Sequence, residues 1–266
     1  MSERLAPIAR RLAAAGVPAV LVTVREARGS TPRDAGTRML VDEAAIHGTI
    51  GGGRLEWAAI ARARAMMASG DTQAIMSLPL GPAVGQCCGG HIVLALIALN
   101  PTVIDRLAAD EAAEAAGLPT VLMFGAGHVG MALVDALQLL PVRVAWYDQR
   151  REAPEQASSE DPLAAIEAAP PGAAVVVATH DHPLDFAITE AALLRPDFAY
   201  IGMIGSGTKK ARFGRGFLAH GHDAALLERL TCPIGGATVR DKRPAVIAAL
   251  VAAELLTVLL AQAADD

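Results

Sequence analysis

The chain has 266 residues, of which 53% are hydrophobic, and its formal net charge is −5. This length and composition suit a soluble globular protein with two domains of ordinary size. Because the sequence has no long run of lysine or arginine, we expect neither a nucleic-acid partner nor a polybasic contact with a membrane. The odd number of cysteines, three, argues against a disulfide framework and for reduced thiols in the cytoplasm.

The N-terminal segment, MSERLAPIARRLAAAG, carries charges among its apolar residues and predicts an amphipathic helix. It lacks the apolar core and the small-residue cleavage site of a signal peptide, so a cytoplasmic protein is expected. The most apolar stretch, residues 245–260, contains Glu254 and is shorter than the roughly 20 residues of a membrane span. It predicts a buried helix, which could also lie at the interface of a homodimer.

Two short β-branched runs at residues 18–24 and 37–41 predict strands, and the polar loop RGSTPRDAG, which contains Arg33, connects them. The next loop, GTIGGG, contains Gly51 and Gly52 and is followed by a helical pattern. Since the free N–H groups of a glycine loop at a helix start can hold an anion, this loop is a candidate ligand site.

Two of the three cysteines, Cys87 and Cys88, stand in the stretch GQCCGGH, before Gly89, Gly90 and an apolar run that predicts a strand. A thiolate between glycines can be approached closely, and nearby arginine side chains would lower its pKa. Adjacent residues of a strand point to opposite faces, so at most one of the two thiols faces a given ligand. The alternative is that both cysteines, like Cys232, pack as small hydrophobic side chains.

Residues 100–119 are rich in alanine and charged side chains and are bounded by prolines, which favours a domain boundary. We therefore predict an N-terminal domain over residues 1–105, a linker over 106–118 and a larger C-terminal domain over 119–266. The predicted fold class is α/β in both domains, and the GSTPR, GTIGGG and CCGG loops belong to the smaller N-terminal one.

From residue 120 onward, strands and helices alternate in the pattern of a Rossmann-like parallel sheet. The strand VLMF leads into G-x-G-x-x-G, formed by Gly125, Gly127 and Gly130, and a helix and a second strand that ends at Asp148 follow. In dinucleotide-binding proteins such glycines allow a tight turn, close approach of a phosphate and helix packing, and the acid binds ribose hydroxyls. His128, inside this turn, is a candidate for ligand contact or for helix capping.

Two further apolar runs, residues 174–178 and 198–203, predict buried parallel strands. His180 and Asp181 follow the first run and Ser206 follows the second, at the sheet edge where α/β proteins bind ligands. The segment between the second and third strands of this domain holds four prolines and predicts no regular helix. This half of the domain is therefore not a standard dinucleotide-binding unit.

In chain order, the motifs RGSTPR, GTIGGG, CGG, FGAGHVG, THDHPLD and YIGMIGS resemble those of the XdhC/CoxI family, accessory proteins of molybdenum hydroxylases. The stretch CPIG near the C-terminus is similar to the xanthine dehydrogenase branch of that family. The chain departs from other branches at residues 236–240, where GATVR stands in place of a Leu-Asp-Ile-Gly pattern.

This resemblance implies a chaperone rather than an enzyme that turns over a substrate. Such a protein binds the molybdenum cofactor, Mo-molybdopterin, protects it while a cysteine desulfurase installs its sulfido ligand, and inserts it into apo xanthine dehydrogenase. Its partners would be the molybdenum-binding subunit of the dehydrogenase, the desulfurase and the proteins that supply the cofactor. Cys88 would be a molybdenum ligand, since a soft thiolate suits a metal that already has sulfur ligands.

The residues expected to contact the cofactor come from the loops of both domains: Arg33, Gly51, Gly52, Cys87, Cys88, Gly89, Gly90, Gly125, Gly127, His128, Gly130, Asp148, His180, Asp181 and Ser206. Two other classes of function stay open on the residues alone. One is an NAD(P)-dependent oxidoreductase, which would bind NAD(P) or another nucleotide at the Rossmann glycines and Asp148. The other is a structural scaffold for the dehydrogenase that binds no small ligand.

Overall fold

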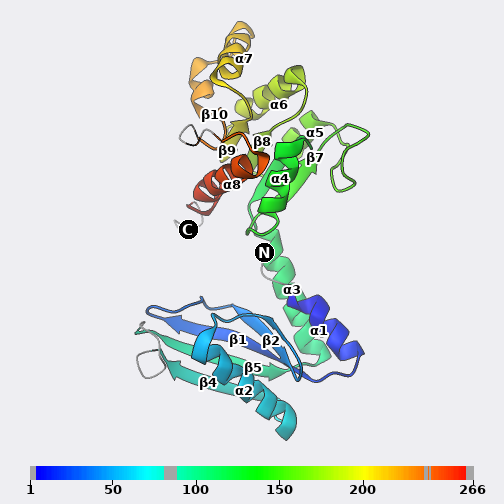
Figure 1. Ribbon diagram of the computed structural model, residues 1–266, viewed down its shortest axis with the longest axis vertical. Helices are drawn as coiled ribbons and strands as arrows, with labels where there is room; N and C mark the ends of the chain where they lie inside the picture. Colours follow the sequence, from blue (N-terminus) through cyan, green and yellow to red (C-terminus); the bar gives the residue numbers. More distant parts are fainter. Residues whose placement is uncertain (1–3, 81–88, 237–238, 240, 262–266) are drawn as a thin grey trace. The chain divides into compact units, whose positions relative to one another are not determined.

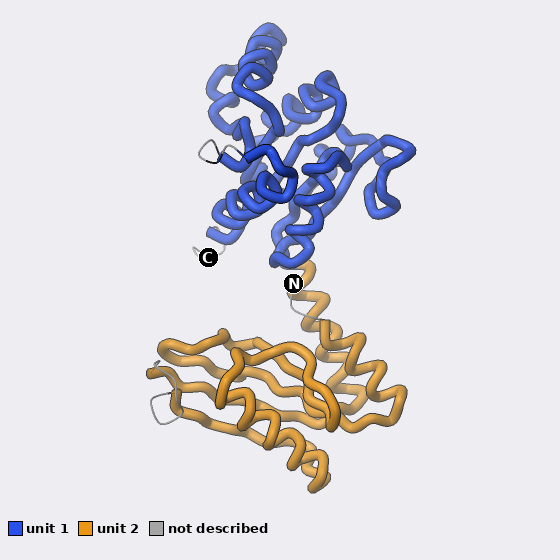
Figure 2. The backbone as a smooth tube through the Cα atoms, in the orientation of Figure 1, with its two compact units in different colours: residues 1, 117–266 blue, residues 2–116 orange. Residues whose placement is uncertain are grey.

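The computed structural model describes residues 4–80, 89–236, 239 and 241–261 of the chain. The chain folds as two compact units, an N-terminal unit of residues 2–116 and a C-terminal unit of residues 117–266, coloured orange and blue in Figure 2. Each unit combines helices with a five-stranded sheet (Figure 1), so the predicted α/β class is confirmed.

The sheet of the N-terminal unit is antiparallel throughout, with the strand order β3-β2-β1-β5-β4. Its strands are β1 (Ala19–Arg28), β2 (Arg38–Asp42), β3 (Ile46–Gly48), β4 (Gln73–Pro79) and β5 (His91–Ala98). Three of them correspond to predicted strands. β3 and β4 were not predicted, because β3 is three residues long and β4 is an edge strand next to a proline-rich and glycine-rich segment.

Helices cover both faces of this sheet. Val20 and Val22 of β1 pack in one core cluster with residues of α2 (Gly53–Ser69). Leu21, which points to the opposite face, packs with residues of α1 (Leu5–Ala14) and α3 (Pro101–Ala116). The alternation of side chains along one strand therefore builds two cores.

The segment predicted as a linker, residues 106–118, is helical up to Ala116 and belongs to α3 of the N-terminal unit. Glu111 of α3 accepts a hydrogen bond from the backbone N–H of Leu5 at the start of α1, with an N···O distance of 2.7 Å. Arg38 of β2 forms ion pairs with Asp110 and Glu114. Alanine-rich sequence with few apolar side chains suits a linker and a helix equally, and these polar contacts fix it as a helix.

The sheet of the C-terminal unit is parallel, with the strand order β10-β9-β8-β6-β7. Its strands are β6 (Thr120–Phe124), β7 (Arg143–Tyr147), β8 (Ala174–Val177), β9 (Tyr200–Met203) and β10 (Leu230–Thr231). The chain order of these strands reverses between β6 and β8, which makes that gap the topological switch point of the sheet. The predicted Rossmann-like sheet is confirmed.

Helices lie on both faces of this sheet as well. The core cluster on one face joins the sheet to α4 (His128–Leu137) and α8 (Pro244–Ala261). The cluster on the other face joins it to α5 (Pro162–Ala168), α6 (His182–Leu194) and α7 (Gly207–Ala219). A short 3-10 helix, Ala224–Arg229, leads into β10.

The crossover between β7 and β8 is irregular, as predicted. Its only described helix, α5, has seven residues and begins at Pro162, with Asp161 as its N-cap. Before α5 the chain runs beside β7, where Ser158 exchanges backbone hydrogen bonds with Trp146 and Asp148. The first βα unit of the sheet is thus regular and the second is not.

Among the described residues, α8 is the one helix that is long and apolar enough to cross a membrane. Within this unit, Val251 and Leu255 of α8 are fully buried against α4 and the sheet. Glu254 accepts hydrogen bonds from the Tyr200 hydroxyl and the Gly235 backbone N–H, at 3.1 and 2.8 Å. This packing is that of a core helix in a folded domain.

Candidate functional site

A cleft of about 250 Å³ opens at the carboxyl ends of β6, β7 and β8, beside the topological switch point. In open α/β sheets this is the edge where ligands bind. The residues that line the cleft are Phe124, Gly125, Tyr147, Asp148, Gln149, Arg150, Pro162, Thr179, His180, Asp181 and Leu184. We refer to this as the Rossmann cleft.

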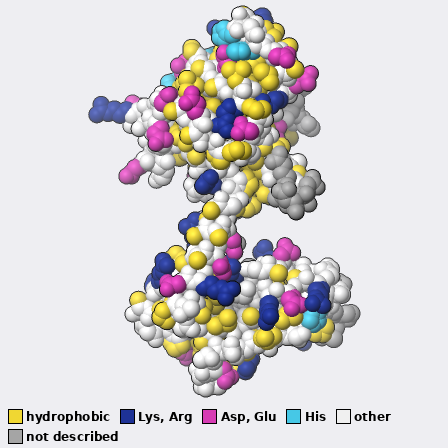
Figure 3. Space-filling view, turned by 180° about the vertical axis from the view of Figure 1, so that it is seen from behind, with side chains coloured by type: hydrophobic (Ala, Val, Ile, Leu, Met, Phe, Trp, Pro, Cys, Tyr) yellow, Lys and Arg dark blue, Asp and Glu magenta, His cyan; other side chains and the backbone are white. Residues whose placement is uncertain are grey.

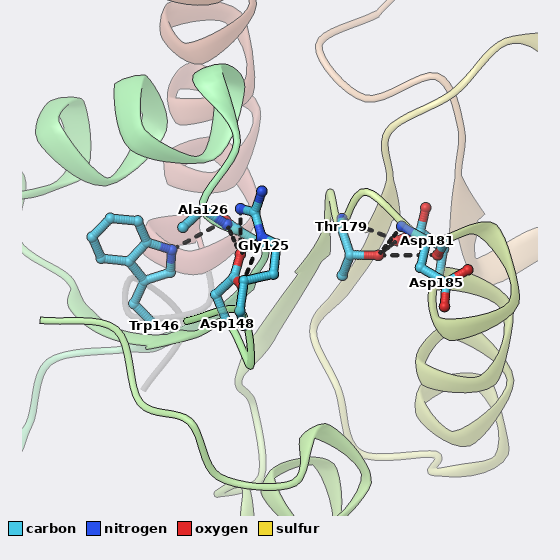
Figure 4. Close-up of polar contacts among 8 residues, drawn as sticks. Gly125, Ala126, Trp146, Asp148, Thr179, Asp181 and Asp185 are labelled. Atoms are coloured by element: carbon cyan, nitrogen blue, oxygen red, sulfur yellow. Dashed lines mark hydrogen bonds and ion pairs between the residues drawn. The ribbon is translucent and has the colours of Figure 1, made fainter. Parts of the chain in front are cut away.

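Packing requires two of the three motif glycines. Gly125 has a φ of +110°, and a Cβ there would lie 2.2 Å from the Ala178 carbonyl oxygen. A Cβ on Gly130 would lie 2.2 Å from the carbonyl oxygen of Gly125. Trp146 donates a hydrogen bond from its Nε1 to that same carbonyl, at 3.1 Å (Figure 4). The turn between β6 and α4 is therefore held rigidly against the sheet.

Gly127 differs from its two neighbours in the motif. A Cβ at this position would meet no atom within 4 Å among the described residues, and its φ of −75° is open to any residue. Gly127 is also the N-cap of α4, where no described side chain caps the helix. An uncapped helix start with open space in front of it presents backbone N–H donors and the positive end of the helix dipole. This is the arrangement that an anionic ligand group needs.

Both oxygens of the Asp148 carboxylate accept hydrogen bonds from donors of the protein itself. Its Oδ2 accepts from the Ala126 N–H at 2.6 Å and from Arg150 Nη2 at 2.7 Å. Its Oδ1 accepts from the backbone N–H and the Nε of Arg150, both at 2.9 Å. Burial raises the pKa of the Asp148 carboxyl, but the hydrogen bonds and charge of Arg150 and the Ala126 N–H outweigh burial and lower that pKa to about 2.

These hydrogen bonds leave Asp148 no acceptor site for a ribose hydroxyl. A carboxylate has about four lone-pair sites, and all of them are used here. A ribose hydroxyl would have to displace Arg150 before it could bind. As the structure stands, Asp148 holds the glycine turn and orients Arg150, whose half-buried guanidinium lines the Rossmann cleft.

Replacing Asp148 by asparagine should lower the free energy of unfolding at pH 7 by about 2 kcal/mol. The pKa of this carboxyl is lower in the folded protein than in the unfolded chain. Its contribution is therefore complete above about pH 5 and is lost as the pH falls toward 2. Urea unfolding at pH 7 and pH 3 measures this, with the exposed Asp135→Asn as the control. The difference between Asp148→Asn and the wild type should shrink at pH 3, and a difference independent of pH would contradict the assignment.

The opposite wall of the Rossmann cleft rests on a buried ion pair. Asp185 of α6 is fully buried and pairs with Lys209 of α7. Its Oδ1 accepts hydrogen bonds from the backbone N–H and the hydroxyl of Thr179, at 3.0 and 2.7 Å (Figure 4). Lys209 also donates to the Ile204 carbonyl at 2.9 Å. Asp185 and Lys209 thus tie the loop after β8 to the loop after β9.

An aromatic pair forms the floor of the Rossmann cleft. The rings of Phe124 and Tyr147 stack with their centroids 5.2 Å apart and an angle of 20° between their planes. Burial and the charge of Glu160 raise the pKa of the Tyr147 hydroxyl. The side chain is therefore neutral at pH 7 and offers a flat face and a hydrogen-bond donor.

The structure brings together some of the predicted contact residues and separates others. Asp148, His180 and Asp181 line the Rossmann cleft together with Gly125. His128 is the exposed first residue of α4. Ser206 is the N-cap of α7, where its Oγ accepts from the Lys209 N–H at 3.4 Å, and it does not line the cleft.

The loops of the N-terminal unit pack against one another. A Cβ on Gly51 would lie 2.7 Å from Pro32 and 3.4 Å from the side chain of Arg33. A Cβ on Gly90 would lie 2.3 Å from the Ser30 carbonyl oxygen. The RGSTPR loop therefore touches both the GTIGGG loop and the glycines that precede β5. Arg33 and Gly89 are exposed beside it.

Two of the predicted contact residues, Cys87 and Cys88, lie outside the described residues. The third cysteine, Cys232, is buried in the core of the C-terminal unit, as the sequence predicts. Burial raises the pKa of its thiol. Cys232 is therefore a packed thiol rather than a reactive one.

The GTIGGG loop is not the open anion site that its sequence suggests. Glu56, one turn into α2, accepts hydrogen bonds at its Oε2 from the Ile50 N–H at 3.0 Å and the Gly52 N–H at 3.1 Å. The Thr49 hydroxyl donates to the same oxygen at 2.5 Å. Glu56 thus accepts from the N–H groups of Ile50 and Gly52, and Thr49 Oγ1 accepts from that of Gly51, so these amides are already paired within the protein. Cofactor contact by Gly51 and Gly52 stays a prediction.

The sequence did not predict the ion pair of Arg150 with Asp148, the hydrogen bonds of Glu56 with its loop, or the Asp185–Lys209 pair. The sequence does contain a signal for Arg150. An arginine two residues after the acid of a Rossmann unit is close enough to form an ion pair with that acid. The Asp185–Lys209 pair depends on a contact between α6 and α7 that spacing does not reveal.

Comparison with known proteins assigns the chain to a family. A model of the XdhC Rossmann domain matches residues 121–255, and a model of the XdhC and CoxI family matches residues 12–78. The chain belongs to the XdhC and CoxI family. The resemblance inferred from the loop motifs is thereby confirmed, and both matches fall on the elements that carry those motifs.

Two individual proteins are also similar to this chain. The uncharacterized protein YqeB of Escherichia coli strain K12 is 26% identical over 266 residues, which cover 94% of this chain but 45% of that protein. The chain thus spans less than half the length of this relative. A Bacillus halodurans protein named as a xanthine dehydrogenase has a crystal structure with a TM-score of 0.77 and 18% identity, covering 98% of this chain and 96% of the other. That likeness shows a shared fold.

Proposed function

We propose that this XdhC and CoxI family member is an accessory protein for the maturation of xanthine dehydrogenase. In this proposal it binds the molybdenum cofactor, holds it while a cysteine desulfurase adds the sulfido ligand, and delivers it to the molybdenum-binding subunit of the apo-dehydrogenase. Family membership supports the maturation role. The single observation that carries cofactor binding is the Rossmann cleft, which Gly125 lines, with the uncapped start of α4 two residues farther along the chain at Gly127.

The residues of the Rossmann cleft fit this group chemically. Molybdopterin has a flat heterocycle and a phosphate tail. The Tyr147 ring, backed by the buried ring of Phe124, offers a flat apolar face for a heterocycle. The start of α4 at Gly127 offers N–H donors to a phosphate, and Arg150 adds a positive charge. When bound, the group would supply the molybdenum centre of the client enzyme, and this chain's residues would hold it and shield it from water.

A nicotinamide nucleotide suits the Rossmann cleft less well. Its adenosine ribose would need the Asp148 carboxylate, which Arg150 and Ala126 already fill. The short helix α5 also makes the second βα unit irregular. These features favour the accessory role over an NAD(P)-dependent oxidoreductase, although the family assignment by itself leaves catalysis open.

The other elements of the proposal concern partners and place. We propose that the protein acts in the cytoplasm as a homodimer and that it receives cofactor from the proteins that make it. The Ala-rich outer face of α8, with exposed Ala249 and Ala253, supports a surface on which a second copy could pack. Cys88 is proposed as a thiolate ligand of molybdenum.

The test of this function is reconstitution of an active client. Apo xanthine dehydrogenase is incubated with sulfurated cofactor, either free or preloaded on this protein, and the rate of xanthine oxidation is measured over time. Preloaded cofactor should activate the enzyme faster and to a higher level than the same amount of free cofactor. Equal activation in both arms would overturn the accessory role.

Replacing Cys88 by serine should reduce retention of the molybdenum cofactor while the protein folds normally. Serine has nearly the same shape, but its hydroxyl is a harder and far less acidic ligand than a thiol. Cys87→Ser is the matched control, and it should retain more cofactor because Cys88, and not Cys87, is the thiol of the Cys-Gly-Gly motif. Cofactor binding is measured beside thermal unfolding, and full retention by Cys88→Ser would remove the thiolate from the proposal.

A further inference from the structure

We infer that the C-terminal unit carries a site for a divalent transition-metal ion, formed by Glu190, His220 and His222. Among the described residues these three form a group with metal-ligand chemistry, and their ligand atoms all lie within 4.8 Å of one another. None of them lines the Rossmann cleft. This inference is independent of the proposed cofactor role and stands or falls on its own test.

Three segments of the chain bring the ligand atoms together. Glu190 projects from α6, His220 is the C-cap of α7, and His222 lies just beyond it, before the 3-10 helix. Both carboxylate oxygens of Glu190 lie 3.0 Å from His220 Nδ1, and one of them lies 2.8 Å from His222 Nε2. Figure 3 shows histidine side chains gathered on the surface of this unit at its α7 end.

The local backbone explains why two histidines in H-G-H spacing face one carboxylate. Gly221 has a φ of +87°, a left-handed conformation that reverses the chain direction after α7. The ring of His222 packs on the ring of Phe217, with centroids 4.6 Å apart, and this contact fixes its orientation. The side chain of His222 is 24% exposed, whereas that of His220 is 61% exposed. The site thus lies at the protein surface, with His222 partly buried and His220 exposed to solvent.

The donor set selects a class of metal. Two imidazole nitrogens and one carboxylate oxygen suit Zn²⁺, Co²⁺, Ni²⁺ and Cu²⁺ rather than Mg²⁺ or Ca²⁺, which prefer oxygen ligands. Burial raises the pKa of the Glu190 carboxyl, but hydrogen bonds from His222 and His220 outweigh burial and lower it. The two imidazole nitrogens and the carboxylate oxygen together offer three donor atoms to one divalent cation.

Three protein ligands leave at least one coordination position open. Structural zinc sites are usually closed by four protein ligands, whereas sites with three keep a position for water or another ligand. Glu190 lies six residues beyond Leu184, which lines the Rossmann cleft, and so about 9 Å farther along α6. A metal at this site would clamp α6 to the end of α7 without blocking the cleft.

The test is a titration of the full chain, purified without a histidine tag, with Co²⁺ followed by its visible absorption, and then displacement by Zn²⁺. One Co²⁺ per chain should give visible d–d bands, and Zn²⁺ should abolish them. His220→Ala and Glu190→Gln should each weaken Co²⁺ binding by at least about tenfold. His182→Ala, an exposed histidine on the same helix as Glu190, is the matched control and should bind like the wild type.

Thermal unfolding of each variant separates loss of the site from loss of the fold, and His220→Ala is the safer variant because its side chain is exposed. Bands lost in His220→Ala and Glu190→Gln but kept in His182→Ala would support the site. Absence of Co²⁺ bands in the wild type at millimolar metal would overturn it. Equal Co²⁺ affinity in all four proteins would also overturn it, and the cluster would then be a hydrogen-bonded carboxylate with two imidazoles.

Discussion

Replacing Lys209 by methionine is expected to destabilise the C-terminal unit by about 3–5 kcal/mol, because it leaves a buried carboxylate without its counter-charge. Asp185 is fully buried, and Lys209 supplies its positive partner. Thr179 would still donate two hydrogen bonds to the carboxylate, but neutral donors do not replace a charge in a medium of low dielectric constant. Urea unfolding at pH 7, followed by circular dichroism, measures the loss.

Two further variants show whether the pair is the cause. Lys242→Met removes an exposed lysine from the same unit and should leave the free energy of unfolding within about 0.5 kcal/mol of the wild type. The double variant Asp185→Asn, Lys209→Met removes both charges and should be more stable than Lys209→Met alone. A Lys209→Met protein that unfolds within about 1 kcal/mol of the wild type would show that the buried pair does not support the wall of the cleft.

Replacing Gly127 by valine is expected to abolish cofactor binding and to leave the fold intact. The position has a φ of −75° and open space around it, so a side chain costs the folded protein little. The same side chain would fill the space in front of the first N–H groups of α4, which an anionic ligand group needs. Binding is measured by calorimetry with molybdenum cofactor, and an affinity loss of at least about 100-fold is expected, since a clash at the anion site removes several hydrogen bonds.

Gly216→Val is the matched control for this substitution. Gly216 also has open space around it, but it lies within α7 and takes no part in the glycine turn between β6 and α4. This variant should bind cofactor like the wild type. If Gly127→Val keeps both its thermal midpoint and full affinity, the Rossmann cleft is not where the cofactor binds. Gly125→Val cannot serve this purpose, because its side chain would strike Ala178 and the effect on binding could not be separated from misfolding.

The sequence predicts the C-terminal unit well because its features are local. A strand, a glycine turn, a helix and a second strand follow one another, and the structure places β6, Gly125, α4 and β7 in that order. The apolar runs of β8 and β9 are equally local, since strands covered on both faces need apolar residues throughout.

The sequence predicts the role of a residue less well where another side chain of the protein competes with the ligand. Asp148, at the end of β7, stands where a Rossmann unit has the acid that binds ribose hydroxyls. Arg150 folds back and donates hydrogen bonds to both oxygens of its carboxylate. The glycines at 51–53 have the composition of an anion loop, yet Glu56 reaches back from α2 and accepts hydrogen bonds from the N–H groups of Ile50 and Gly52. In both cases a charged side chain close in the chain competes with the external ligand. Residue spacing alone does not show which of the two forms the hydrogen bonds.

The boundary between the two units shows a related limit. Residues 106–116 contain one large apolar side chain, Leu107, among alanines and charged residues, and Ile104 and Leu107 are the buried residues of α3. The contacts of Glu111 with the start of α1 and of Arg38 with two α3 acids hold the helix on its unit. Such polar contacts between distant elements leave no periodic pattern in the sequence.

Binding of the molybdenum cofactor in the Rossmann cleft, as proposed, is tested by identifying the ligand that copurifies with the protein. The full chain and its Gly127→Val variant are purified from cells that make the cofactor, and the ligands they release are identified by mass spectrometry. The wild type should release a molybdopterin species, and Gly127→Val should release little or none. A nicotinamide nucleotide alone from the wild type, or equal amounts of molybdopterin from both proteins, would contradict it.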